Sequence, residues 1–88
     1  MPQTDIKKAR QNAKKIGVEV QASSRKGKKL DVFDPHSGAK LASIGDLKYK
    51  DFLQTGDREM QRRYKARHEA LRKKRGTPSY FADQILWS

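Results

Sequence analysis

The feature that most constrains this chain is the basic stretch from Asp57 to Gly76, DREMQRRYKARHEALRKKRG. Asp57 can begin a helix by accepting backbone N–H bonds, and Gly76 followed by a Thr-Pro pair would end it. The stretch therefore predicts a single helix about 28 Å long. Between Arg58 and Arg75, nine Lys and Arg residues stand against two Glu, so this segment carries +7 of the chain's net charge of +11.

The expected helix has two chemically different faces. At 100° per residue, Met60, Tyr64, Arg67 and Leu71 share one stripe, with His68 beside it, and this stripe needs a surface to pack on. The bases on the opposite face would meet an acidic partner; they are Arg58, Arg62, Lys65, Arg72 and Lys73.

Composition limits the kind of domain and partner. The chain has 88 residues, of which 34% are hydrophobic and 35% charged, so we expect one small domain with a thin core. It contains no cysteine, which fits a reducing compartment, and we expect neither a signal peptide nor a membrane span. A charge of +11 favours a polyanionic partner, although a basic surface can also serve solubility alone.

The N-terminal segment predicts a separate helix. Thr4 can cap it, Gly17 can end it, and an apolar seam recurs at three- and four-residue steps; the seam is Ile6, Ala9, Ala13 and Ile16. We therefore divide the chain into an N-terminal basic helix, 1–17, and a small domain, 18–88.

Three short runs with strand character follow this helix. They span Val18–Ala22, Leu30–Phe33 and Ala39–Ile44, and polar turns at Ser23–Lys28 and Asp34–Gly38 separate them. Leu47–Leu53 predicts a short helical turn and Pro78–Trp87 a last short helix. The predicted fold is α+β, with a small three-stranded antiparallel sheet packed against the long basic helix and flanked by short N- and C-terminal helices.

Several segments together resemble a known but uncharacterised family. They are SSRKGKKLDVF, ASIGDLKYKDF, RRYKARHEAL and GTPSYFADQILW, and the resemblance covers about Ala22 to Trp87, most specifically around Arg62–His68 and the closing Leu86-Trp87. The family comprises small basic proteins encoded by tailed phages and large eukaryotic DNA viruses. The resemblance implies a viral origin and a role in the particle, and it implies no catalytic residue. Thr4–Ile16 lies outside it.

Two basic regions are candidate nucleic-acid contacts. Guanidinium groups bind phosphate oxygens bidentately, and the basic helix face and the turn after the first strand both offer such groups. The candidate residues are Arg25, Lys26, Lys28, Lys29, Arg58, Arg62, Lys65, Arg72 and Lys73. The alternative in both regions is a solvated charged surface.

Arg67 raises a different question because it lies within the apolar stripe. A charge there costs free energy unless it is paired, so we expect an internal ion pair with Asp34, Asp46 or Asp51. The alternative is an arginine whose stem packs while its guanidinium reaches water.

The aromatic residues and histidines give no sign of catalysis. The aromatics could stack on bases, but in so small a chain we expect them to form the core; they are Tyr49, Phe52, Tyr64, Tyr80, Phe81 and Trp87. We expect Phe52, Tyr64, Leu71 and Trp87 to share one buried cluster. His36 and His68 lack further zinc ligands at a recognisable spacing, and His68 is expected to be structural. No nucleophile or phosphate-loop motif occurs, so we expect no enzyme, cofactor or metal.

The preferred function is a virus-encoded, non-enzymatic virion component, either a minor capsid protein or an internal accessory protein. Its basic surface would contact packaged nucleic acid, expected to be DNA, or acidic patches on capsid proteins. It would reside in the virion, or otherwise in the cytoplasm or nucleus of the infected cell. Two alternatives remain open: a DNA-binding regulator or recombination accessory, and an accessory subunit of a nucleic-acid enzyme.

Overall fold

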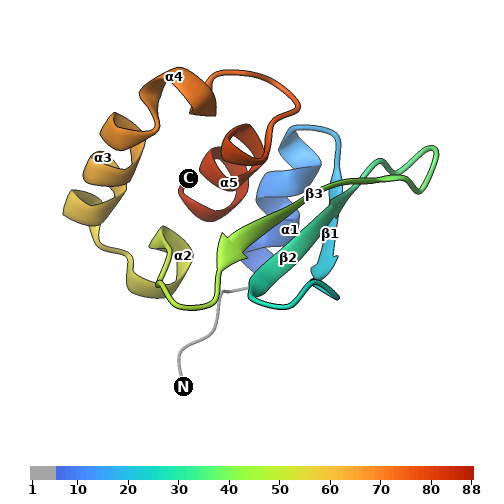
Figure 1. The fold of residues 1–88 in the computed structure, drawn as a ribbon, viewed down its shortest axis with the longest axis horizontal. Coiled ribbons are helices and arrows are strands. Elements are labelled where there is room, and N and C mark those ends of the chain that lie inside the picture. The colour runs from blue at the N-terminus through green and yellow to red at the C-terminus, as the bar shows by residue number, and fades with distance from the viewer. Residues whose placement is uncertain (1–5) are drawn as a thin grey trace.

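A computed structural model describes residues 6–88 as one α+β unit (Figure 1). The elements are α1 (Ile6–Lys15), β1 (Glu19–Ala22), β2 (Lys28–Phe33), β3 (Lys40–Asp46), α2 (Phe52–Thr55), α3 (Arg58–Arg67), α4 (Glu69–Arg72) and α5 (Pro78–Leu86). The predicted α+β class and the three-stranded antiparallel sheet are confirmed. The predicted cap Thr4 lies outside the described residues. None of the helices in the described part is long and apolar enough to cross a membrane.

The sheet has the order β1-β2-β3, and both pairs are antiparallel. Alternation places Val20, Leu30, Val32 and Ile44 on one face, where all four are buried. On β3 the register shifts: Val32 pairs with Ala42, but Phe33 pairs with Lys40. This β-bulge leaves the residue between them, Leu41, without a partner on β2. The apolar alternation seen in the sequence thus fixes which face of the sheet carries the core.

Helices α5 and α1 cover the sheet. Figure 1 shows α5 in the middle of the molecule, between α3 and α1. Ile85 and Leu86 of α5 and Ala9 and Ala13 of α1 are completely buried with the apolar strand residues. The Asn12 Nδ2 donates a 3.0 Å hydrogen bond to the Ile85 carbonyl, which ties the two helices together. The prediction that the basic helix packs on the sheet is therefore wrong, because the apolar C-terminal helix takes that position.

The predicted single helix from Asp57 to Gly76 is also wrong. Asp57 does cap α3, accepting from the N–H groups of Glu59 and Met60, but α3 ends after 10 residues. His68 leaves helical geometry, with φ −106° and ψ 17°, and α4 then adds only four residues. In a continuous helix the Lys65 carbonyl would accept from the Glu69 N–H; here the Arg72 Nε donates to it, at 3.1 Å. The break turns the chain around α5, which a straight rod could not follow.

The break changes which predicted core residues are buried. Trp87 is buried, and Phe52 and Tyr64 are partly buried against the core, in agreement with the prediction. Leu71 is 52% exposed, so its assignment to the core is wrong. The helical stripe that links Tyr64 to Leu71 in the sequence does not continue past His68, because His68 departs from helical dihedral angles.

Candidate nucleic-acid interface

Lys29 holds the β2 strand to the start of α2. Its Nζ lies 2.9 Å from Asp51 Oδ2 and also donates to the Tyr49 carbonyl and to Gln54 Oε1, both at 2.6 Å. The Asp51 carboxylate in turn caps α2, and the Gln54 side chain completes the capping box. Only 8% of the Lys29 side chain is exposed. The predicted phosphate contact of Lys29 is therefore wrong, because its ammonium group is satisfied inside the fold.

Asp83 forms ion pairs with two more of the predicted contact residues. This α5 carboxylate is 1% exposed; Lys65 Nζ lies 3.1 Å from its Oδ1, and Arg72 Nη1 lies 3.7 Å from its Oδ2. The Lys65 ammonium approaches Oδ1 without hydrogen-bond alignment, so the contact is chiefly ionic. Lys65 and Arg72 were expected on the outward face, but both turn inward because the kink at His68 brings α3 and α4 around Asp83.

Asp31 forms a third buried acidic centre, on β2. Its carboxylate accepts from the Ser23 and Ser43 hydroxyls at 2.6 and 2.7 Å and from the Ser24 N–H at 3.2 Å, and Lys40 lies 3.7 Å away. The hydroxyl hydrogen bonds from Ser23 and Ser43 are the main reason that the pKa of Asp31 lies far below its ordinary value of 3.8. The Asp31 carboxylate therefore stabilises the sheet and is not part of the exposed surface.

Two exposed acids pair with cations along α3 and α4. Glu59 contacts Arg62 at 2.7 Å and Arg63 at 3.3 Å. Glu69 contacts Lys73 and, at 2.7 Å, Arg72. Hydrogen bonds from these cations lower the pKa of both carboxyl groups. Such solvent-exposed pairs stabilise a fold little, and a phosphate can compete for their cations.

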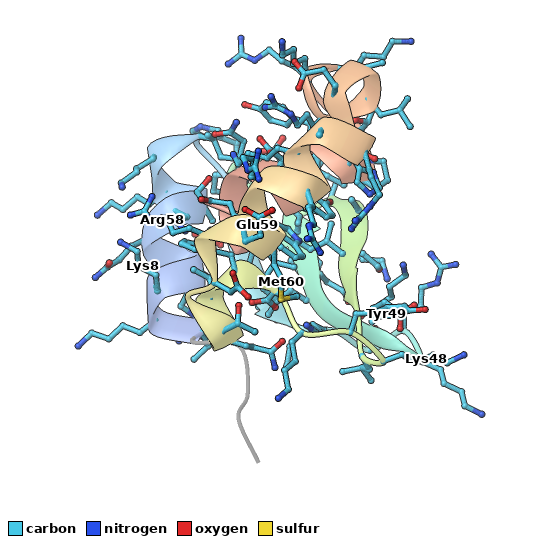
Figure 2. All side chains as sticks on the ribbon, turned by 90° about the vertical axis from the view of Figure 1, so that its left-hand side faces the viewer. Lys8, Lys48, Tyr49, Arg58, Glu59 and Met60 are labelled. Carbon is cyan, nitrogen blue, oxygen red and sulfur yellow. The ribbon has the colours of Figure 1, made fainter. Side chains whose placement is uncertain are left out.

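Many exposed cations have no ion pair within residues 6–88. Among the predicted contacts these are Arg25, Lys26 and Arg58, and the last also lies 5.8 Å above the Phe52 ring. Others are Lys7, Arg10, Lys14, Lys15, Lys48, Lys50, Lys74 and Arg75. Arg62 and Lys73 are exposed but paired, and Lys28 is partly buried. Figure 2, which views the molecule from the α3 side, shows Arg58 near the start of that helix and Lys48, from the loop after β3, at the opposite edge of the view.

Arg67 does not form the predicted internal ion pair. It is exposed and has no ionic partner among residues 6–88. The Asp34 and Asp46 carboxylates each accept the N–H of a residue in their own turn, and Asp51 binds Lys29. The prediction is wrong: Arg67, Asp46 and Asp51 line the same open cleft, but no ion pair joins Arg67 to either carboxylate.

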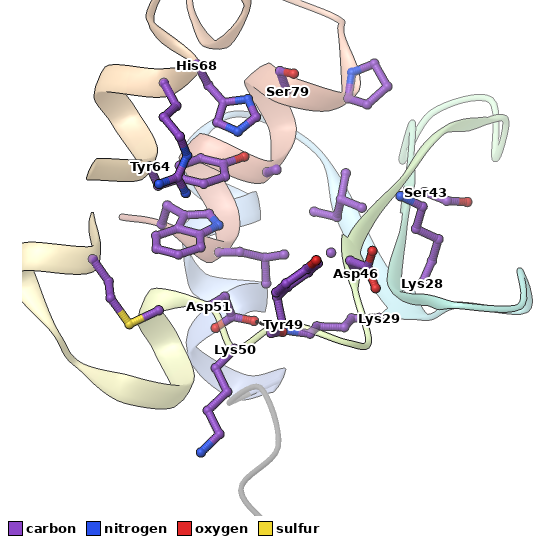
Figure 3. A pocket seen from close by; sticks show the side chains of 18 residues that line it. Lys28, Lys29, Ser43, Asp46, Tyr49, Lys50, Asp51, Tyr64, His68 and Ser79 are labelled. Atoms are coloured by element: carbon purple, nitrogen blue, oxygen red, sulfur yellow. Dashed lines mark hydrogen bonds and ion pairs between the residues drawn. The ribbon is translucent and has the colours of Figure 1, made fainter. Parts of the chain in front are cut away.

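That cleft, of about 470 Å³, separates β3 and the following loop from α3 and α5 (Figure 3). Its helical wall carries a stack of three rings. The Tyr64 ring lies 4.1 Å from the Trp87 ring at an interplanar angle of 2°, and the His68 ring lies 4.3 Å from Tyr64 at 28°. Burial is the main cause that raises the pKa of Tyr64, so this ring stays neutral. We name the three rings of Tyr64, His68 and Trp87 the aromatic stack.

Tyr49 lines the other side of the cleft. It was expected in the core but is 70% exposed, because it lies in the loop after β3 rather than on a buried helical turn. Figure 3 shows Tyr49 and Lys50 on the loop side and Tyr64 and His68 on the helical side. The described residues contain no group of three or more His, Cys, Asp or Glu side chains placed to hold a metal ion.

The comparison with protein families decides the classification. Residues 18–68 match the model of a family of unknown function, DUF5754. The chain belongs to the DUF5754 family. No curated protein and no solved structure matches it.

The matched DUF5754 segment contains the sheet, α2 and α3, whereas α5 lies outside it. The cleft therefore combines the two parts: Tyr49, Tyr64 and His68 come from the DUF5754 segment, and Trp87 directly follows α5. Sequence reasoning missed this cleft. The four-residue spacing of Tyr64 and His68 was visible, but the contribution of Trp87 depends on how α5 folds back.

Proposed function

We propose that this protein is a non-enzymatic virion component that binds nucleic acid through its phosphates. One observation carries the binding proposal: within residues 6–88, nearly all of the acids are engaged by the fold itself. Asp31, Asp51 and Asp83 are buried, Asp57 caps a helix, and the remaining engaged acids bind turn N–H groups or exposed cations. The positive surface therefore has few internal acids left to neutralise it.

Two surfaces supply the proposed phosphate contacts. One is the outer side of the α3–α4 segment and the loop after it, with Arg58, Arg62, Lys73, Lys74 and Arg75. The other is the turn between β1 and β2, with Arg25 and Lys26, beside the partly buried Lys28. Arginine and lysine side chains that are free to move can follow a phosphate backbone without reading its sequence.

The virion part of the proposal rests on the resemblance of residues 22–87 to small basic viral proteins. A structural role in a particle suits a protein that neutralises packaged nucleic acid and performs no chemistry. Mass spectrometry of purified particles tests this part directly. Presence of the protein at a fixed ratio to the capsid protein supports it, and presence only in infected-cell extract contradicts it.

The salt dependence of duplex DNA binding tests the phosphate contacts. Each phosphate that a cation neutralises releases counterions, which contributes about −0.9 to the slope of log K against log salt. We expect Lys74→Gln/Arg75→Gln to make this slope less steep by about two and to weaken all sequences alike. Fluorescence anisotropy at several salt concentrations gives both quantities.

The matched control is Lys7→Gln/Arg10→Gln, which removes the same charge from α1. Both of its residues are exposed, and α5 lies between α1 and α3 (Figure 1). We expect a smaller change of slope for the control. Equal changes would show that only net charge matters, and a lack of binding in dilute buffer would refute the phosphate proposal.

A further inference from the structure

We propose that the cleft between β3 and the α3–α5 wall receives an unpaired base of a single-stranded nucleic acid. The inference rests on the proposed function, since phosphate contacts bring the strand to the protein, but it concerns a different surface. Binding of a base in the cleft would select single strands over duplexes, which phosphate contacts alone do not do.

The helical wall offers a preformed aromatic surface. Trp87 is 8% exposed, and Gln61 Nε2 donates a 2.8 Å hydrogen bond to its carbonyl, which connects α3 to the end of α5. The near-parallel Tyr64 and Trp87 rings hold each other in place, and His68 extends the stack. A wall that is already ordered loses little conformational entropy when a ligand binds.

Tyr49 provides an accessible ring on the loop side. A tyrosine that is 70% exposed contributes little to the core, so the fold gives no reason for an aromatic residue at this position. The apolar residues Ile44, Ala82 and Leu86 also line the cleft. Trp87 and His68 cover the two faces of Tyr64, so the accessible ring on which a flat base can stack is Tyr49, and the ordered rings and apolar side chains form the rest of the cleft.

The charges around the cleft suit a strand with a phosphate backbone. Lys28, Lys50 and Arg67 line it and have no ion pair among residues 6–88. Lys29 and Asp51 also line it, but they neutralise each other, which leaves Asp46 as the opposing charge. The base would enter the cleft while the adjoining phosphates contact these cations.

Double-stranded nucleic acid should not bind in this cleft, because its bases are paired and stacked. In a duplex the bases are stacked on each other and their faces are covered, so no base can stack on Tyr49 without being unpaired first. A single strand exposes its bases at no such cost. We therefore expect the cleft to favour single strands while the outer cations bind both forms.

The test compares Tyr49→Ala with Leu47→Ala. Leu47 is a matched control because it is 63% exposed, belongs to the same loop and does not line the cleft. The probes are an oligothymidylate of about ten nucleotides, the same oligonucleotide with abasic sites, and a duplex of equal length. About ten nucleotides is within the range of lengths that single-strand-binding domains contact. Abasic sites keep the phosphates and remove the bases.

We expect the wild-type protein to bind oligothymidylate more tightly than its abasic form. Tyr49→Ala should weaken oligothymidylate binding about tenfold, as expected for the loss of one base stack, with duplex binding and its salt slope unchanged. Leu47→Ala should change neither, and Tyr49→Phe should retain the affinity. Trp87 is the only tryptophan, so its fluorescence should respond to oligothymidylate and not to the abasic probe. The same gain with oligouridylate would extend the cleft to RNA and support the proposal.

The outcomes separate this inference from the proposed function. If the wild type binds the abasic probe as tightly as oligothymidylate, or if Tyr49→Ala has no effect, the cleft proposal is wrong. Salt-dependent duplex binding would leave the phosphate proposal standing in that case. If no probe binds in dilute buffer, both proposals fail.

Discussion

The buried carboxylate of Asp83 connects α5 to α3 and α4, and its removal should destabilise the fold. Asp83 is 1% exposed, and the Lys65 and Arg72 side chains that approach it retain 30% and 20% of their exposure. Removing one member of a buried ion pair costs about 3–5 kcal/mol when the other member stays buried and unpaired. Here both cations can reach water, and Arg72 keeps its contact with Glu69, so we expect Asp83→Ala to cost about 2–3 kcal/mol.

Thermal unfolding measures this effect directly. For a domain of this size, about 1 kcal/mol shifts the melting temperature by about 4–8 °C, so Asp83→Ala should lower it by about 10–20 °C. The matched control is Glu69→Gln, which removes another carboxylate from Arg72 but at an exposed position. We expect the control to change the melting temperature very little, since exposed ion pairs stabilise little.

Hydrogen exchange adds a spatial test. Because Asp83 connects α5 to both α3 and α4, its loss should speed amide exchange in α4 more than in the sheet. Equal melting temperatures for Asp83→Ala and Glu69→Gln would refute the argument that Asp83 holds the kinked segment in place. Uniform acceleration of exchange in the sheet and in α4 would refute its local character.

Two further predictions concern the sheet. The pKa of Asp31 is lower in the folded protein than its ordinary value of 3.8, so its ionised form stabilises the fold above about pH 4, and this contribution is lost as the pH falls toward the folded pKa. Urea unfolding should therefore show the wild type to be more stable than Asp31→Asn near pH 6, with a smaller difference near pH 3. A difference that does not change with pH would contradict this role of Asp31. Gly45→Ala should destabilise by about 1–3 kcal/mol, because φ is +79° and the new Cβ would lie 2.9 Å from Leu86 Cδ1. Gly38→Ala, at φ +75° with no atom within 4 Å of the Cβ, is the control for strain alone, and an equal loss in the two variants would show that the contact with Leu86 does not matter.

Local patterns in the sequence were sufficient to predict the three strands and the first helix. Alternation at Val20, Leu30, Val32 and Ile44 set the buried face of the sheet, because successive strand residues point to opposite sides. The predicted strand ends agree with the structure to within two residues. The apolar seam of the first helix includes Ala9 and Ala13, and both are completely buried. These features depend on neighbours in the chain and are therefore visible in it.

The tertiary structure decided where the long basic stretch bends and which of its cations remain outside. From the sequence, Asp57 to Gly76 favours one helix, and neither glycine nor proline interrupts it. The break at His68 places Lys65 and Arg72 on two short helices that both approach Asp83, a buried carboxylate of another helix. A helical pattern in one segment carries no information about a buried charge elsewhere, because that charge acts only after the core has formed. The same reason separates the cations: sequence alone establishes the net charge of +11, but folding determines which positive groups the buried acids neutralise and which face water.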